Sequence, residues 1–349
     1  LEQARDLDDR ARRHTVRMAT EVLNEQLMRA DFMMCASTRQ RDFWLGHLAA
    51  LGRVNPHTYD DDDSLRSLID VVPFGVPDVT PAANQQVLKG VLPGVGRDDK
   101  VILWGGGIYN WFDPLTLINA VDRLRRRAPN VRLVFMGLRH PNPDIPEMRM
   151  ALAARELSAR LGLTDVHVFF NEGWIDYDKR TDWLLESDVG VSTHLAHLET
   201  ALSFRTRVLD YIWASLPVVA TRGDVLADLV ASRELGITVE PADVVALEDA
   251  LFRLLDDDGL RKTCRENEAT LAPELAWSRA LQPLLEFCRH PRRAPDLLDP
   301  LATARLRREL GPPPAVSGLR RELTIAFGHL KEGGPKQVAA KALSRLKSK

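Results

Sequence analysis

The sequence predicts an α/β protein whose main domain is a Rossmann-like parallel sheet. From residue 100 onward, short apolar stretches alternate with longer segments of helical pattern, which is the order expected of βαβ units. Glycines and charged residues follow several of these stretches, at the positions where a parallel sheet binds its ligands. Hydrophobic residues make up 45% of the 349-residue chain, as in packed globular proteins.

A shorter α/β segment precedes this domain, and we expect residues 1–77 to be the end of a first domain. In chain order its elements are a helix over 1–30, a strand over 31–37, a helix over 39–51, a polar loop or short turn structure over 52–67 and a strand over 69–74. Gly75, Pro77 and Pro81 then interrupt regular structure and mark a linker.

Residues 78–290 carry the regular alternation and are predicted to form the second domain. The expected strands cover 101–104, 131–136, 166–169, 189–191, 216–221 and 236–239. The expected helices cover 115–127, 148–161, 179–185, a segment from near Ser203 to Ala214, 225–233, 244–255, 260–269 and a closing helix over 275–288. Loops that follow parallel strands line the ligand crevice, so they hold the candidate site.

Bulk composition narrows the class of protein. A net charge of −2 gives no reason to expect nucleic acid as a partner. The three cysteines are too few and too scattered for a disulfide framework or a zinc cluster. No apolar run approaches the roughly 18–20 residues that span a bilayer, and no signal segment opens the chain, so we expect a soluble, cytoplasmic protein. The first residue is Leu1 rather than Met, which suggests a fragment.

Residues 291–349 differ in composition and are predicted to form a tail rich in proline and basic residues. Residues 301–349 contain eleven Lys or Arg, three Glu and no Asp. Three interpretations remain open: a solvated, partly disordered tail, a peripheral contact with an anionic membrane, or a linker into a further domain. Basic clusters gain about 1 kcal/mol per Lys or Arg near an anionic surface, so the charge is sufficient for the second.

A triglycine, Gly105-Gly106-Gly107, follows the expected strand 101–104 and precedes a helix. Glycines at this place let the backbone approach a bound phosphate and point N–H groups at it. A plain tight turn is the alternative interpretation. No Arg or Lys stands in the loop 105–113, so the charge that neutralises a phosphate must come from elsewhere.

The segment 189–224 carries the densest set of chemical groups. In chain order these groups are His194, His197, Glu199, Ser203, Arg205 and Arg207. The two arginines stand near a helix start, where backbone N–H groups attract anions. Because alternate helix positions face different directions, we expect one arginine to meet phosphate. Arg205, with Ser203 as a possible cap, is the first choice, and Arg207 is a second phosphate ligand or a structural ion-pair partner.

Asp210 lies in the helix that leads into Ala214-Ser215-Leu216-Pro217-Val218-Val219-Ala220-Thr221. This pattern resembles the signature region of GT-B glycosyltransferases of the retaining family-4 type, the glycosyl transferases group 1. Ala30-Asp31-Phe32 and the segment 71–77 resemble the end of that family's first domain. The resemblance covers roughly residues 30–290. It implies a GT-B fold in which this chain holds the donor-binding half and the end of an acceptor-side domain.

The resemblance also implies which residues bind a nucleotide diphosphate sugar. The implied donor contacts are Gly105, Gly106, Gly107 and Asn110 in the glycine loop, Gly173 and Trp174 near the nucleobase, and His197, Arg205, Arg207 and Asp210 in the signature region. Asp210 would accept hydrogen bonds from the ribose hydroxyls. The commoner family pattern has an Arg and a Lys near the glycine loop, which this chain lacks, so Arg205 or Arg207 would supply the charge.

The family's loop acid lies eight positions before its helix acid, but position 202 here is Leu. Glu199 stands three residues earlier. Either the loop is longer and Glu199 reaches the donor sugar, or the role is lost. We predict the contact and assign Glu199 and Arg205 as the catalytic residues.

The two histidines of this loop could also be metal ligands. His194 and His197 have no second pair and no cysteine beside them, so no metal is predicted. We expect one histidine to pack structurally and the other, assigned to His197, to contact the donor sugar or the acceptor.

The function implied by the resemblance is a retaining, metal-independent glycosyltransferase that needs no cofactor beyond its nucleotide sugar. Its acceptor would be a saccharide or lipid-linked hydroxyl in cell-surface glycan or glycolipid synthesis. A nucleotide-sugar epimerase on the same scaffold and a non-catalytic nucleotide-binding module are the alternatives. Because most of an acceptor domain is expected to be missing, this chain alone is predicted to be weakly active.

Overall fold

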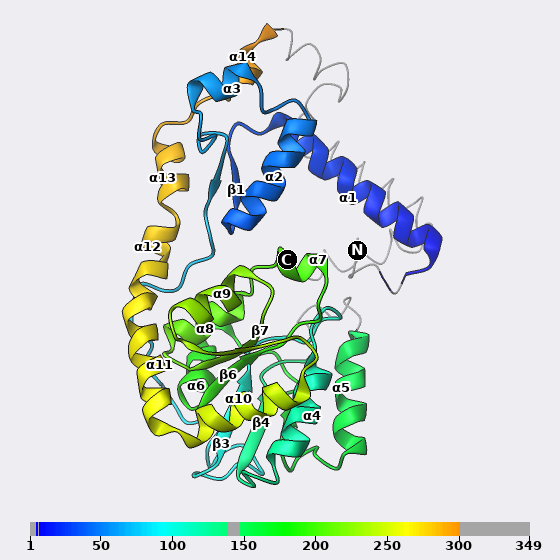
Figure 1. The fold of residues 1–349 in the computed structure, drawn as a ribbon, viewed down its shortest axis with the longest axis vertical. Helices are drawn as coiled ribbons and strands as arrows, with labels where there is room; N and C mark the ends of the chain where they lie inside the picture. The colour runs from blue at the N-terminus through cyan, green and yellow to red at the C-terminus, as the bar shows by residue number, and fades with distance from the viewer. Residues whose placement is uncertain (1–4, 6, 139–146, 301–349) are drawn as a thin grey trace, which may run out of the picture.

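The structure is a computed structural model that describes residues 5, 7–138 and 147–300. Two α/β units lie one above the other along the long axis (Figure 1). The smaller unit is built from residues 7–71 together with the last described helices, and the larger unit carries the main sheet.

The larger unit contains a six-stranded sheet in which every neighbouring pair is parallel. Its strands are β3 (Lys100–Trp104), β4 (Val131–Phe135), β5 (Val168–Phe170), β6 (Val189–Ser192), β7 (Val218–Thr221) and β8 (Gly236–Val239). Their order is β5-β4-β3-β6-β7-β8, so the chain starts in the middle, winds to one edge and returns to build the other. The direction of winding therefore reverses between β3 and β6, where parallel α/β sheets bind ligands.

Helices cover both faces of this sheet because successive strand residues point to opposite sides. In β3, Ile102 and Trp104 face one core, whereas Val101 and Leu103 face the other. The first face is covered by α4 (Pro114–Leu124), α5 (Arg149–Arg160) and α10 (Val244–Asp256). The second is covered by α6 (Arg180–Leu185), α8 (Thr206–Trp213) and α9 (Val225–Ser232). The prediction of a parallel α/β domain is confirmed.

The smaller unit holds a parallel pair of short strands, β1 (Met33–Cys35) and β2 (Ile69–Val71). Around them lie α1 (Asp9–Arg29), α2 (Thr38–Ala50), α3 (Pro56–Asp61) and α14 (Pro295–Leu298). A buried ion pair joins Arg53 Nε to Asp296 Oδ2 at 2.6 Å. The last described residues therefore pack back onto the first unit.

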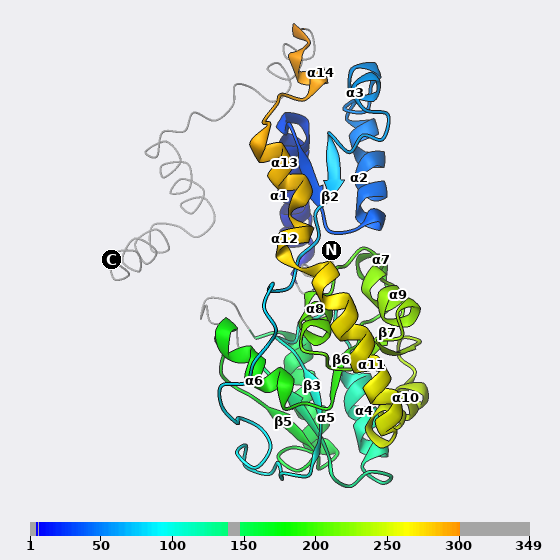
Figure 2. The same ribbon diagram turned by 90° about the vertical axis from the view of Figure 1, so that its left-hand side faces the viewer.

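Two chain segments cross side by side between the units. Val76 accepts a backbone hydrogen bond from Trp277 at 2.9 Å and donates one to Leu275 at 2.9 Å. At Gly75 a β-carbon would lie 2.8 Å from the Trp277 backbone, so only glycine fits. On the two sides of the crossing, α11 (Asp258–Leu271), η2 (Ala272–Leu275), α12 (Trp277–Ala280) and α13 (Gln282–Arg289) follow one another up one side of the molecule (Figure 2).

The structure differs from the sequence prediction in four local places. The expected loop 52–67 contains α3. Asn55 and Thr58 cap the start of this helix with reciprocal hydrogen bonds. The helix expected from near Ser203 starts at Thr206, and a separate short helix, α7 (Leu198–Ala201), precedes it. The closing helix is split at Leu281, between α12 and α13, and Pro283 in the first turn of α13 lacks a backbone donor. The expected tail 291–349 begins with α14, and its basic part, 301–349, lies outside the described residues.

Within the described part of the chain, no helix has both the length and the apolar content that crossing a bilayer requires.

Candidate active site

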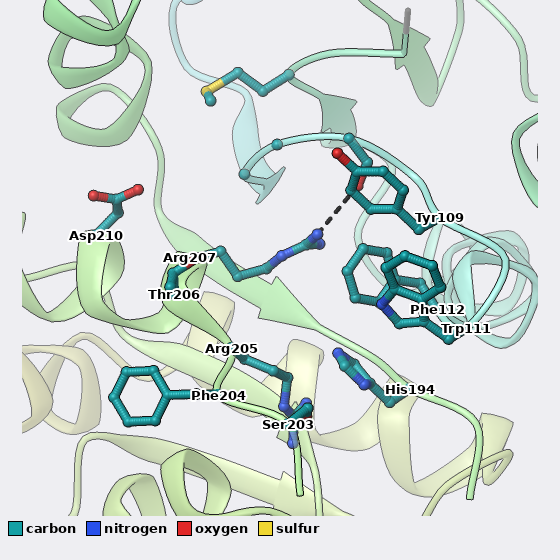
Figure 3. Close-up of a pocket in the computed structure, with 14 residues that line it drawn as sticks. Tyr109, Trp111, Phe112, His194, Ser203, Phe204, Arg205, Thr206, Arg207 and Asp210 are labelled. Carbon is teal, nitrogen blue, oxygen red and sulfur yellow. Dashed lines mark hydrogen bonds between the residues drawn. The ribbon is translucent and has the colours of Figure 1, made fainter. Parts of the chain in front are cut away.

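A cavity of about 280 Å³ opens at the carboxyl ends of β3 and β6, where the winding reverses (Figure 3). It is lined by Gly105, Gly106, Gly107, Tyr109, Trp111, Phe112, Met136, His194, Ser203, Phe204, Arg205, Thr206, Arg207 and Asp210. Six of the residues predicted from the sequence therefore lie together: the three glycines, both arginines and Asp210.

The glycine loop is held from below by Tyr211, which is fully buried in α8. Its hydroxyl accepts a hydrogen bond from the Gly105 N–H at 2.7 Å and lies 3.0 Å from the Val191 carbonyl. The Gly105 amide is therefore already bonded within the protein. Gly106 and Gly107 are therefore the candidates for a phosphate contact through N–H groups, which stays a prediction. Gly106 has φ of +98°, a conformation that favours glycine.

Arg207 reaches across the middle of the cavity from the first turn of α8 (Figure 3). Its guanidinium lies 4.2 Å from the Phe112 ring centroid and 4.5 Å from that of Trp104. Nη2 donates to the Gly107 carbonyl at 3.1 Å, whereas Nη1 is buried without a hydrogen-bond partner among the described residues. Burial lowers the pKa of Arg207 to about 10, so the side chain stays cationic at neutral pH.

Arg205 also borders the cavity, but its guanidinium is committed to the protein. It is 4% exposed and forms an ion pair with Asp224, which is fully buried. Nη1 donates to the Ser192 carbonyl at 2.9 Å, and Nη2 donates to the Thr221 carbonyl. Asp224 in turn caps the start of α9. This geometry gives Arg205 a structural task and corrects its choice as the first phosphate ligand, because Arg207 holds the available nitrogen.

Asp210 lies on the side of the cavity opposite Tyr109, Trp111 and Phe112 (Figure 3). Its Oδ1 accepts a hydrogen bond from Arg180 Nε at 3.1 Å, and its side chain is 34% exposed. Arg180 packs against the ring of Tyr177 at 3.4 Å from its centroid and near Trp213 at 5.0 Å. Burial raises the pKa of Asp210, and Arg180 opposes that rise. Arg180 thus fixes the carboxylate and favours its charged form.

His194 enters the cavity from the loop after β6 and is 1% exposed. Its ring lies edge-on to Phe112, with 4.8 Å between ring centroids. Neither ring nitrogen has a hydrogen-bond partner among the described residues. Burial, followed by the charges of Arg205 and Arg207, lowers the pKa of His194 to about 2.

The other predicted donor residues do not line this cavity, and their donor contacts stay predictions. His197 caps α7, where its Nδ1 accepts from the Thr200 N–H at 3.2 Å. Asn110 accepts a hydrogen bond from the Met150 N–H at 3.2 Å. Glu199 is exposed on α7. Gly173 and Trp174 are exposed in the loop after β5, and Trp174 has 52% of its surface free.

Several residues of the site were not assigned to it from the sequence. Arg180 and Asp224 lie 30 and 19 positions from their partners in sequence order, and only the fold brings each pair together. Tyr109, Trp111 and Phe112 form an aromatic wall in which the first two rings stack 4.9 Å apart. The run Tyr-Asn-Trp-Phe after the triglycine was the available signal for this wall.

A divalent metal site is not apparent in the described ranges, which contain no group of three or more His, Cys, Asp or Glu side chains able to hold an ion. The cavity instead combines a cation, open glycine amides and a carboxylate. A cation and N–H groups suit phosphate oxygens, and a carboxylate suits hydroxyl groups.

Comparison with known proteins shows similarity to glycosyltransferases. Residues 99–257 match the family described as Glycosyl transferases group 1. A stretch of 172 residues is 28% identical to a protein named probable sucrose-phosphate synthase 2 of Oryza sativa subsp. japonica. That match covers 46% of this chain and only 17% of the rice protein.

Solved structures show the same fold. A sucrose-phosphate synthase from Thermosynechococcus elongatus aligns with a TM-score of 0.53 at 18% identity, over 82% of this chain and 64% of that one. A UDP-forming α,α-trehalose-phosphate synthase from Burkholderia xenovorans aligns with a TM-score of 0.57 at 16% identity, over 77% of this chain and 63% of that one. The chain thus spans less than two thirds of these proteins.

Proposed function

Because residues 99–257 match the group 1 glycosyltransferases and the fold is that of GT-B glycosyltransferases, we propose that the chain transfers a sugar from a nucleoside diphosphate sugar to an acceptor hydroxyl. One observation carries the proposal. Arg207, with an unpartnered buried nitrogen within the described structure, shares one cavity with the open Gly106 and Gly107 amides and with the Asp210 carboxylate. These groups match a diphosphate and a ribose in chemistry.

In the proposed reaction the bond between the anomeric carbon and the diphosphate oxygen breaks, and a bond to the acceptor oxygen forms. The electron pair leaves with the diphosphate, and the acceptor proton is transferred to the departing phosphate. Arg207 would stabilise the negative charge that develops on the leaving group. We propose retention of configuration at the anomeric carbon, supported by the family-4 signature around Asp210.

We further propose that this charge is neutralised by Arg207 and backbone amides and needs no divalent cation. A fixed cation held over aromatic rings is already in place before the substrate binds, so little reorganisation is required. For the acceptor we propose a saccharide or lipid-linked hydroxyl in cell-surface glycan synthesis. The basic segment 301–349 supports a peripheral contact with an anionic membrane through its composition.

The first test is donor binding. The melting temperature of the chain is measured with UDP, GDP, ADP and TDP, and with a sugar derivative of each. The nucleotide and the nucleotide sugar of one base should raise it. Titration calorimetry of that pair in EDTA should give an unchanged affinity. Failure of all four nucleotides to bind would contradict the proposed function, and loss of binding in EDTA that Mn²⁺ restores would contradict its metal independence.

The second test is the stereochemistry of transfer. The chain, extended by any natural upstream sequence, is incubated with the binding donor and a panel of saccharide and lipid-linked acceptors. NMR of the product should show the same anomeric configuration as the donor. An inverted product would overturn retention, and interconversion of the donor sugar without transfer would identify an epimerase instead.

A further inference from the structure

The ring nitrogens of His194 have no role in the proposed binding of phosphate and ribose. Both ring nitrogens are buried and lack a hydrogen-bond partner among the described residues, although the side chain borders the cavity. Its backbone N–H, in contrast, donates to Thr221 Oγ1 at 2.9 Å. Buried polar atoms almost always have partners, so an orphaned ring at a cavity wall points to a ligand.

The chemistry of that ligand follows from the charge state of the ring. Burial and two neighbouring guanidinium groups hold the pKa of His194 at about 2, so the imidazole is neutral throughout the physiological range. A neutral imidazole has one N–H donor and one acceptor nitrogen. A ligand group can therefore accept a hydrogen bond from the protonated nitrogen or donate one to the other nitrogen.

The groups of the cavity wall do not supply such a partner. Arg205, the nearer arginine, is committed to Asp224 and backbone carbonyls, and Phe112 offers only the edge of a ring. Diphosphate oxygens are acceptors only, and Arg207 with the glycine amides already suits them. A sugar hydroxyl can either donate or accept, so it can hydrogen-bond whichever ring nitrogen faces the cavity.

We propose that His194 is a specificity residue that hydrogen-bonds a hydroxyl group of the transferred sugar. The proposal rests on the proposed function, because it requires a nucleotide sugar in this cavity. Figure 3 shows the ring reaching from its loop toward the space between Arg205, Arg207 and Phe112, on the side of the cavity away from Asp210. With the ribose at Asp210 and the diphosphate at Arg207, the sugar would lie next to His194.

The experiment compares a nucleotide with its sugar derivative in the full chain. His194→Phe keeps a planar ring against Phe112 but removes both nitrogens, and His194→Asn keeps a donor and an acceptor. The probes are UDP and UDP-glucose, together with GDP and GDP-mannose, measured by titration calorimetry. His290→Phe, at the exposed end of α13, is the matched control. Circular dichroism and melting temperature establish that each variant is folded.

In His194→Phe, the affinity gained from the sugar should fall about fivefold to tenfold, while nucleotide affinity changes less than about twofold. His194→Asn should lose less, and the control should lose nothing. The deoxy analogues test which hydroxyl is bound, using nucleotide sugars that lack the 2-, 3-, 4- or 6-hydroxyl. One analogue should bind the wild-type protein more weakly than the parent nucleotide sugar does. The same analogue and the parent should bind His194→Phe equally well. That analogue identifies the hydroxyl.

Three results would overturn the inference. Equal losses for nucleotide and nucleotide sugar would place His194 in the nucleotide grip, and an unchanged ratio in both variants would make it a packing residue. Both results leave the proposed function intact, because nucleotide still binds. If neither nucleotide pair bound the wild-type chain and no other base did so, the proposed function and this inference would fall together.

Discussion

Two arginines that are two positions apart have different tasks in this chain. Arg205 is buried against Asp224 and anchors the loop ends of β6 and β7, whereas Arg207 reaches the cavity with an unpartnered nitrogen in the described structure. A helix turns by about 100° per residue, so alternate positions face nearly opposite sides. The sequence predicted this division of tasks, but it favoured Arg205 for the phosphate, whereas the structure pairs Arg205 with Asp224.

We expect Arg207→Met to weaken diphosphate binding far more than nucleoside binding, by about 1–3 kcal/mol for the lost charged hydrogen bonds. Calorimetry with nucleoside, monophosphate and diphosphate measures the difference, which should shrink as salt is added. Arg205→Met is the comparison. It should instead lower the free energy of unfolding by about 3–5 kcal/mol, because it leaves a buried carboxylate unpaired. Equal losses for all three ligands in Arg207→Met would remove it from the phosphate site.

The carboxylate at position 210 predicts a pH dependence of nucleotide binding. Burial raises the pKa of Asp210 and Arg180 opposes that rise. Only the ionised form accepts hydrogen bonds from both ribose hydroxyls, so affinity should be full above the folded-state pKa and should fall as pH drops through it. In Arg180→Met the opposing charge is gone, so the loss of affinity should begin at a higher pH than in wild type.

Calorimetry from mildly acidic to neutral pH tests this shift. A 2′,3′-dideoxynucleotide is the ligand control, because it lacks the hydroxyls that Asp210 would bind. If Arg180→Met moved the profile of the dideoxynucleotide as much as that of the parent, Arg180 would be acting on the structure of the site and not through Asp210.

At the scale of elements, α8 is the helix on which the site is built. Its Tyr211 packs against Gly190 of β6, where a β-carbon would lie 2.6 Å from the tyrosine ring. The same side chain carries the hydroxyl that holds the Gly105 amide and the carbonyls of β3 and β6. A glycine in one strand and a tyrosine in a helix are therefore matched in shape.

Tyr211→Phe should lower the free energy of unfolding by about 1–3 kcal/mol, because it leaves the buried Gly105 N–H without a partner. Denaturant titration measures this change. The glycine loop would lose its support as well, so diphosphate affinity should fall with it. Thr263→Val, on the exposed face of α11, is a control that should leave both quantities within about 0.5 kcal/mol.

A second element carries an unfavourable group, Glu268 of α11. Both carboxyl oxygens are buried without hydrogen-bond partners in the described part of the chain, and burial raises the pKa of Glu268 well above its usual value. The folded state then holds a proton that the unfolded state releases. Stability from this group is therefore greatest below the unfolded pKa and declines as pH rises toward the folded pKa.

Glu268→Gln should consequently stabilise the protein at neutral pH by about 1–3 kcal/mol, with the gain shrinking toward zero near pH 4 (about the pKa of an unperturbed glutamate). Melting temperatures of wild type and variant between these limits measure the difference. A gain that stays constant with pH would show that the carboxyl is ionised or neutral equally in both states.

The strands and their parallel order could be predicted because fully buried parallel strands read as continuous apolar runs bounded by turn residues. The glycine loop was proposed from its place directly after a strand, and Asp210 from the resemblance of its segment to the family's signature region. Arg180 was not, because its role depends on the packing of α6 against α8. His194 and His197 were distinguishable only after the loop fold showed that the second one caps α7.

At the scale of the whole molecule, the two units touch near the cavity as well as at the crossing. Arg39 of α2 pairs with Asp228 of α9 at 2.6 Å and donates to the Gly223 carbonyl at 2.9 Å. Gln40 donates to the Leu202 carbonyl at 2.8 Å, just before the residues that line the cavity. The first unit therefore braces the loops on which the site depends.

The double variant Arg39→Ala, Gln40→Ala should loosen these loops while lowering overall stability by at most about 1 kcal/mol per exposed pair. Hydrogen exchange should rise around residues 201–205 and 223–228, and exchange in β3 should stay unchanged. Uniformly faster exchange over the whole chain would show global destabilisation and would contradict a local brace.

The paired crossing at Val76 and Trp277 leaves the two ends of the larger unit as immediate neighbours. In chain order, the larger unit is inserted into the smaller one, and the chain enters and leaves it at the same place. Domains with adjacent ends tolerate excision, transplantation and circular permutation. Residues 77–276 are accordingly a suitable unit for grafting into another protein. In a circular permutant, a short glycine-containing linker would join residue 276 to residue 77.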